Sequence, residues 1–263
     1  CVKMANDKEL IKIQDGSSLY LVNNVDEFIA NKKANMQTYC LGTIKQLQEE
    51  AFYATRNSTN RRLDNNFTNM KKELFNIICE DNDLIQLDAA NCQYAILAHL
   101  IKIEGDKTVI MKEDFLLFQE LVETGTFYEY VKNNLGLYNK NEAKAKMMEI
   151  WFSSFLNNTT FKKDFKEIFP TVIEWIDNFK KQGHVKKTED EPAIDNSYQF
   201  AILLQTVESE MFVDNLLIRC LEENIFCITK HDSLIVKRKD ETRVREIMKE
   251  YFNEINFKAK INN

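Results

Sequence analysis

Two short apolar segments, far apart in the chain, each place one aspartate at the end of a predicted β-strand. The first segment leads into Asp88, and the second, residues 225–236, contains Asp232. Both are rich in aliphatic and β-branched residues, which is typical of buried strands. Two carboxylates held by adjacent strands are what a two-metal phosphoryl-transfer site requires, because its metal ions lie ~3.5–4 Å apart and clamp the reacting oxygens. The pair therefore predicts a small sheet with a phosphoryl-transfer site at one edge.

The long stretch between the two aspartates, and most of the remaining chain, is predicted to be helical. Only 6 glycines and 2 prolines occur among 263 residues, so few residues interrupt a helix. The spacing of apolar residues predicts helices at 25–30, 38–53, 70–79, 94–101, 112–123, 127–133, 141–156, 161–179, 200–223 and 242–255. Residues 57–69 are predicted to be irregular, and residues 180–196 to form a linker or mobile loop. We expect a helix-rich α+β fold in which a helical subdomain is inserted into a small antiparallel sheet.

Charge and cysteine content restrict the class of protein. The net charge of −6 argues mildly against an unspecific nucleic-acid coat, although it leaves room for a local basic groove. The 6 cysteines show no CxxC spacing, which favours free thiols in a reducing compartment over disulfides or zinc. No signal peptide is visible and no uncharged apolar run approaches ~18 residues, so we expect a cytoplasmic protein without a membrane partner. Because the chain begins at Cys1 instead of Met, we expect a fragment of a longer protein.

The residues after the first aspartate resemble the first acidic motif of family A DNA polymerases. Gln93 follows Asp88 by five positions, and the helix after it contains Ala98-His99-Leu100 in the register of that family. The resemblance implies that Asp88 binds a catalytic metal ion. It also implies that Gln93 packs against the sugar of the incoming nucleotide and excludes a 2′-hydroxyl. The family usually has Glu at this position, so Gln93 keeps the bulk and drops the charge.

A lysine-bearing helix resembles the fingers helix of the same family. Lys140, Lys144, Met148 and Phe152 recur every four residues, which predicts that they share one helical face. The resemblance implies that the two lysines hold the triphosphate, for which Lys is suited as a point charge, and that Phe152 stacks on the nascent base pair. Ser153 stands where the family has Gly, and a Met at position 148 is similar to the single-subunit phage RNA polymerases.

The second aspartate lies in a His-Asp hairpin, as in the third motif of the family. Ser233 follows Asp232, where many DNA polymerases carry Glu and the phage RNA polymerases carry Ser. Two further segments, around residues 59–70 and 205–208, resemble the parts of the family that contact the primer–template and lead into the hairpin. The resemblance assigns nucleic-acid contacts to Arg61, Arg62, Asn69, Gln205 and His231.

The resemblance covers about residues 58–255 and implies a polymerase-type palm, helical fingers and a reduced thumb. We expect the thumb or an N-terminal helical region at 1–57, the palm at 58–102 and 196–263, and the fingers at 103–195. The expected activity is that of a DNA-dependent DNA polymerase in which Asp88 and Asp232 hold two Mg²⁺ ions, or Mn²⁺. The expected partners are primer–template, nucleoside triphosphates, and additional protein subunits that supply a thumb or processivity.

Three other interpretations remain open from the residues alone. One is an RNA polymerase or primase-like enzyme of the same fold. Another is a catalytically inactive, polymerase-derived module for nucleic-acid binding or assembly, which would explain the departures at Gln93, Ser153 and Ser233. The third is a purely structural helical protein, which predicts that Asp88 and Asp232 lie far apart.

Overall fold

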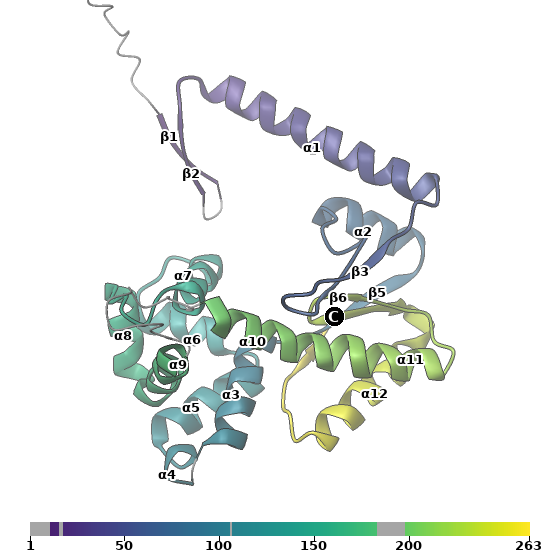
Figure 1. Cartoon of the computed structure of the whole chain (residues 1–263). Helices are drawn as coiled ribbons and strands as arrows, with labels where there is room; N and C mark the ends of the chain where they lie inside the picture. Colours follow the sequence, from purple (N-terminus) through teal and green to yellow (C-terminus); the bar gives the residue numbers. More distant parts are fainter. Residues whose placement is uncertain (1–10, 16–17, 106, 183–197) are drawn as a thin grey trace, which may run out of the picture. The chain divides into compact units, whose positions relative to one another are not determined.

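The computed structural model describes residues 11–15, 18–105, 107–182 and 198–263 (Figure 1). The chain divides into two compact units, Cys1–Phe52 and Tyr53–Asn263. In the first unit, β1 (Ile11–Asp15) pairs antiparallel with β2 (Ser18–Val22), and α1 (Val25–Gln48) follows. The prediction of two helices at 25–30 and 38–53 is wrong, because residues 31–37 contain neither Gly nor Pro and continue one helix. The β1–β2 pair was not predicted.

The second unit is helix-rich with small antiparallel sheets, so the predicted α+β class is confirmed. Its first part contains β3 (Ala54–Arg56), β4 (Leu63–Asn65), α2 (Lys72–Asp81), β5 (Leu84–Ala89) and α3 (Cys92–Glu104). The helical part contains α4 (Lys107–Ile110), α5 (Glu113–Glu123), α6 (Phe127–Asn134), α7 (Lys140–Phe152), α8 (Thr160–Ile168) and α9 (Pro170–Gln182). The last part contains α10 (Tyr198–Ser209), η1 (Glu210–Leu217), α11 (Ile218–Glu222), β6 (Cys227–Lys230), β7 (Ser233–Lys237), η2 (Arg238–Asp240), α12 (Glu241–Glu254) and β8 (Ile261–Asn262).

The larger sheet joins the two segments that carry the aspartates. Its strand order is β6-β7-β5-β8, and every neighbouring pair is antiparallel. Strand β5 pairs with β7 from Leu84 opposite Lys237 to Asp88 opposite Ser233. The short strand β8, which was not predicted, pairs with the other edge of β5 and brings Asn262 opposite Asp88. Leu87 and Leu234 are fully buried between the sheet and its covering helices.

An aromatic core fixes the helical part to the end of β5. The ring of Phe127 on α6 lies 4.5 Å from that of Tyr94 on α3 and 5.3 Å from that of Phe118 on α5, measured between centroids. Tyr94 also lies 4.9 Å from Trp151 of α7. Full burial of an aromatic or large aliphatic side chain contributes roughly 1.5–3 kcal/mol. Helix α3 follows β5 after a short turn. This core therefore holds α6 and α7 beside the C-terminal end of β5, where Asp88 lies.

The predicted helix 161–179 is divided in two by a proline. Helix α8 ends at Ile168, and Pro170 begins α9. A proline fits the first position of a helix because that backbone N–H has no intrahelical partner, whereas in a helix interior it removes a hydrogen bond. The Asp114 carboxylate accepts hydrogen bonds from the backbone N–H and the hydroxyl of Thr171, at 2.7 and 2.8 Å, and so caps α9. The predicted loop 180–196 lies largely outside the described residues.

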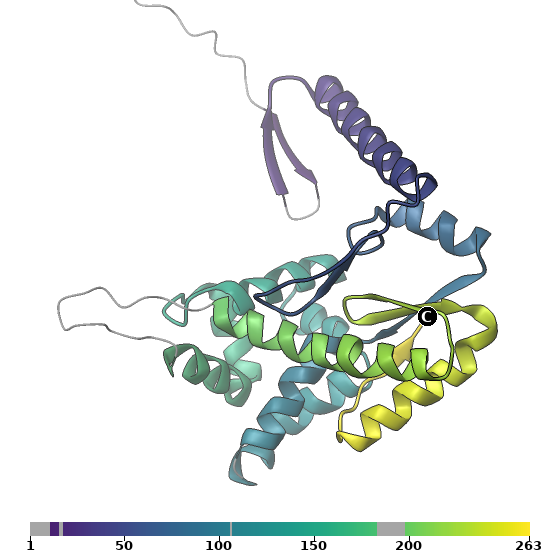
Figure 2. The ribbon, with the colours of Figure 1, turned by 45° about the vertical axis from the view of Figure 1, so that its right-hand side comes forward.

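A long helical rod crosses from the helical part to the sheet. The predicted helix 200–223 is present, but its middle third, η1, has the wider π-helical winding. Figures 1 and 2 show α10, η1 and α11 as one rod that passes alongside the β6–β7 hairpin, and η1 packs against both strands of that hairpin and against α12. Within the described ranges, no helix is both long and apolar enough to cross a membrane.

Candidate functional site

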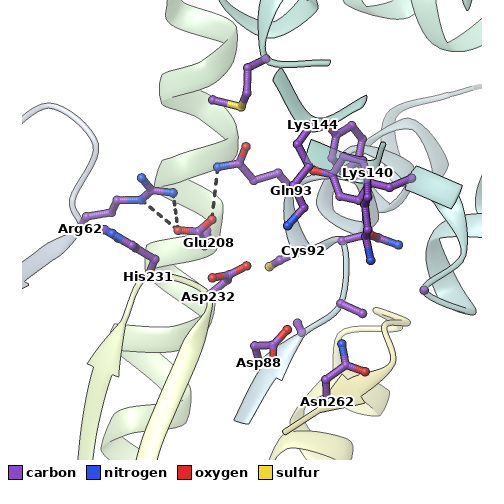
Figure 3. A pocket seen from close by; sticks show the side chains of 17 residues that line it. Arg62, Asp88, Cys92, Gln93, Lys140, Lys144, Glu208, His231, Asp232 and Asn262 are labelled. Atoms are coloured by element: carbon purple, nitrogen blue, oxygen red, sulfur yellow. Dashed lines mark hydrogen bonds and ion pairs between the residues drawn. The ribbon is translucent and has the colours of Figure 1, made fainter. Parts of the chain in front are cut away.

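The two predicted catalytic aspartates lie at the same end of neighbouring strands. Asp88 is the last but one residue of β5 and lies opposite Ser233, and the backbone N–H of Ala89 donates to the carbonyl of Asp232 at 3.2 Å. Figure 3 shows both carboxylates beside the same space, with the Cys92 thiol close to them. The expectation that the two segments meet is therefore confirmed, and the interpretation that requires the aspartates to be far apart is wrong.

Asp232 is presented by a two-residue turn between β6 and β7. Lys230 pairs with Ser233, and His231 between them has a positive φ of 54°, which a tight hairpin turn favours. The buried Ser233 hydroxyl donates to the Lys230 carbonyl at 2.7 Å and accepts from Gln86 at 2.9 Å. Ser233 thus closes the turn instead of adding a ligand to the site.

A cavity of about 460 Å³ opens in front of the two aspartates. Its lining includes these predicted site residues: Arg62, Asp88, Gln93, Lys140, Lys144, Met148, His231 and Asp232. Four predicted residues do not line it: Arg61, Asn69, Phe152 and Gln205. The lining also contains residues outside the predicted site: Cys92, Tyr94, Tyr128, Glu208 and Asn262. Residues more than 140 positions apart thus form one cavity with acidic and basic walls.

The basic wall is formed by α7 and an aromatic ring. The ammonium nitrogens of Lys140 and Lys144 lie 6.0 and 5.4 Å from the centroid of the Tyr128 ring, within the range of cation–π attraction. Figure 3 places both lysines across the cavity from Asp88 and Asp232. Phe152, the predicted stacking residue, has 47% of its surface exposed and lies outside the cavity lining. Tyr128 is therefore the aromatic ring beside the lysines.

The acidic wall holds two buried carboxyl groups with shifted pKa values. The pKa of Asp232 is raised to about 6, first by burial and then by the nearby Asp88, while Arg62 and Lys144 oppose the shift. Burial likewise raises the pKa of Glu208 to about 7, against the attraction of Arg62. Burial keeps the Cys92 thiol neutral by raising its pKa well above the usual range. A cation beside Asp88 and Asp232 would relieve the repulsion that raises the Asp232 pKa.

The two predicted arginines are held by acidic side chains. The Nε and Nη2 atoms of Arg62 donate to Glu208 Oε1 at 2.9 and 2.6 Å. Arg61 is more exposed and pairs with Glu210 and Asp214 at 2.7 and 3.1 Å. Gln205 accepts a hydrogen bond from Asn60 at 2.9 Å. The loop before β4 is therefore anchored along α10 and η1. Arg62 lines the cavity beside Glu208, with which it forms an ion pair.

The oxygen atoms of the site suit a hard divalent cation. In the part of the chain that the structure describes, no group of three or more His, Cys, Asp or Glu side chains is arranged to hold a metal ion. Mg²⁺, however, is commonly held by one or two carboxylates, with water and substrate phosphates completing its octahedral shell. Asp88 and Asp232 fit that smaller requirement, because both carboxylates line the same cavity and Asp88, after burial, contributes to the raised pKa of Asp232.

We expect Mg²⁺ to raise the melting temperature more at about pH 8 than at about pH 5. The folded-state pKa of Asp232, about 6, lies above its ordinary value of 3.8, so ionisation lowers stability as the pH rises through this window. A bound cation offsets that loss only where the carboxylate is charged. Thermal melts at both pH values, with and without Mg²⁺, measure the effect. An equal Mg²⁺-dependent shift in Asp232→Asn would contradict it.

No family model matches the chain, and no curated protein matches it significantly. The function is therefore inferred from the geometry and chemistry of this cavity.

Proposed function

We propose that the chain is a template-directed nucleotidyltransferase with a palm and fingers of the family A type, which adds deoxynucleotides to a primer on a DNA template. The observation that carries this proposal is the single cavity in which Asp88 and Asp232 face Lys140 and Lys144. Within the proposal, the β6-β7-β5-β8 sheet is the palm, the helices from α4 to α9 are the fingers, and the first unit is a reduced thumb.

The chain's own residues have separable tasks in this proposal. Lys140 and Lys144 bind the triphosphate and neutralise part of its charge, because they are the cations on the wall opposite the aspartates. Asp88 and Asp232 hold divalent metal ions, and such ions supply a lowered pKa for an attacking hydroxyl and neutralisation of the leaving pyrophosphate. Gln93 lies between the lysines and Glu208. In this proposal its side chain contacts the sugar of the incoming nucleotide.

Primer extension tests the proposal directly. The wild-type chain is given a labelled primer on a DNA template, dNTPs and Mg²⁺ or Mn²⁺, and extended products are resolved by length. Template-dependent extension supports the proposal, with addition governed by the templating base. The same reactions with NTPs test the RNA polymerase or primase-like alternative, which extension with NTPs alone would favour.

A second candidate is a binding or assembly module without catalysis. It is favoured by the buried Ser233, which closes the hairpin turn at the position where many DNA polymerases carry Glu. Gel-shift binding of primer–template without any nucleotide incorporation would support this candidate over the enzyme.

A further inference from the structure

The buried carboxylate of Glu208 connects three elements that line the cavity. Glu208 lies on α10 and is 1% exposed. Its Oε1 accepts two hydrogen bonds from Arg62, at 2.9 and 2.6 Å, and its Oε2 accepts one from the Gln93 side chain at 3.4 Å. Arg62 comes from the loop before β4, and Gln93 from the first turn of α3. Figure 3 shows this chain of contacts ending at Gln93, beside the lysine wall.

The contact determines how the Gln93 amide is oriented. An ionised carboxylate can only accept hydrogen bonds, so Gln93 must present its NH₂ group to Glu208. Its carbonyl oxygen is then directed away from Glu208. Arg62 binds the other carboxylate oxygen and opposes the effect of burial, so the group is ionised above about pH 7, where the raised pKa of Glu208 lies. The hydrogen bond, at 3.4 Å, favours the rotamer of Gln93 that reaches Glu208.

The pairing also explains why an amide, and not an acid, stands at position 93. A glutamate there would place a second carboxylate against Oε2 of Glu208 in a buried site, where like charges repel strongly. Glutamine at 93 and glutamate at 208 therefore form a matched pair with one negative charge between them. Exchanging the two side chains would preserve the single negative charge and the hydrogen bond between positions 93 and 208, although Arg62 would then face an amide oxygen instead of a carboxylate.

We propose that Glu208 is a positioning residue which, through its hydrogen bond to Gln93, sets the discrimination between deoxyribonucleotides and ribonucleotides. This inference rests on the proposed nucleotidyltransferase function. The Gln93 side chain blocks the space of a 2′-hydroxyl only while Glu208 holds it across the cavity. When the contact is lost, Gln93 turns aside and a ribonucleotide enters more readily.

The test compares dATP with ATP in four proteins: wild type, Glu208→Gln, Gln93→Glu and the double exchange. The kcat/KM ratio is measured on a primer–template with Mg²⁺, and the Kd ratio by equilibrium binding under the same conditions. Loss of a hydrogen bond to a charged group costs about 10- to 100-fold, and this contact is long at 3.4 Å, so each single variant should lose about 10-fold of the preference for dATP. The double exchange should recover the preference to within about 3-fold of wild type.

Asp177→Asn is the matched control. It breaks the ion pair with Lys162, whose atoms are 2.7 Å apart and whose side chains are 8% and 17% exposed, away from the cavity. The dATP preference of this variant should remain that of wild type. An equal loss in Asp177→Asn would mean that general destabilisation, and not positioning, changes the ratio.

The two measurements keep the outcomes separate. If wild type binds dATP in preference to ATP but incorporates neither, the proposed enzymatic function fails. The Kd ratios of the variants then test by themselves whether Glu208 positions Gln93. An unchanged ratio in Glu208→Gln, a failure of the double exchange to recover it, or a wild type without any preference would each overturn the role of Glu208.

Discussion

Replacing Asp232 with Asn is expected to lower nucleotide incorporation by at least ~10³-fold, because coordinated metal ions supply several kcal/mol and each 1.4 kcal/mol is tenfold in rate. Asp232 is held at the hairpin turn beside Asp88, so the substitution removes one of two carboxylates without disturbing the strand register. Asp88→Asn should have a comparable effect. The measurement is single-turnover primer extension at saturating Mg²⁺, with product formation followed over time.

The stability of Asp232→Asn separates lost chemistry from lost structure. Burial and the neighbouring Asp88 raise the Asp232 pKa to about 6, so above that pH the ionised carboxylate destabilises the folded protein. A neutral amide removes this penalty, and the variant should melt at or above the wild-type temperature in the absence of metal. Asp164→Asn, on the exposed side of α8, is the control and should retain full activity. Full activity in either Asp88→Asn or Asp232→Asn would overturn the assignment of both aspartates.

The sequence predicts those features of the site that depend on short-range patterns of residues. An apolar β-prone run marks each buried strand, and the aspartate at its end follows from position alone, as with Asp88 after Leu87. The structure shows that β5 and β7 are neighbours in the sheet. The alternative of distant aspartates was excluded only by the register between Asp88 and Ser233.

A spacing of four residues predicts the lysine face only in part. Each residue of an α-helix turns by about 100°, so a period of four drifts by about 40° per step and by about 120° from position 140 to position 152. Lys140, Lys144 and Met148 accordingly line the cavity, whereas Phe152 does not. The nearby aromatic ring comes from Tyr128 on α6, and its place is fixed by core packing against Tyr94 at 5.2 Å.

The role of Glu208 could not be predicted because it depends on partners distant in sequence. Glu208 is separated from Arg62 by 146 positions and from Gln93 by 115. An acid on an amphipathic helix is usually solvated, and only the tertiary contacts show that this one is buried and paired. Strand β8 was missed for a similar reason, since Ile261 and Asn262 acquire strand geometry from the exposed edge of β5.

The second large effect is expected from Lys144→Ala, which should reduce kcat/KM for nucleotide incorporation by about 10- to 100-fold, the usual value of a hydrogen bond to a charged group. Lys144 lies on the cavity wall opposite the aspartates and lowers the Asp232 pKa. Its removal therefore weakens triphosphate binding and raises that pKa, so the acidic limb of the pH–rate profile should move to higher pH.

Lys146→Ala is the matched control for this prediction. It removes the same charge from the same helix, but Lys146 lies outside the cavity lining and pairs with Glu149 at 3.6 Å. Its kcat/KM and its pH–rate profile should match those of wild type, because neither the triphosphate nor Asp232 depends on it. Steady-state extension over a range of dNTP concentration and pH measures both quantities. Equal losses in the two variants would mean that the change in net charge causes the effect. A larger KM and a shifted acidic limb in Lys144→Ala alone would support a phosphate contact at Lys144.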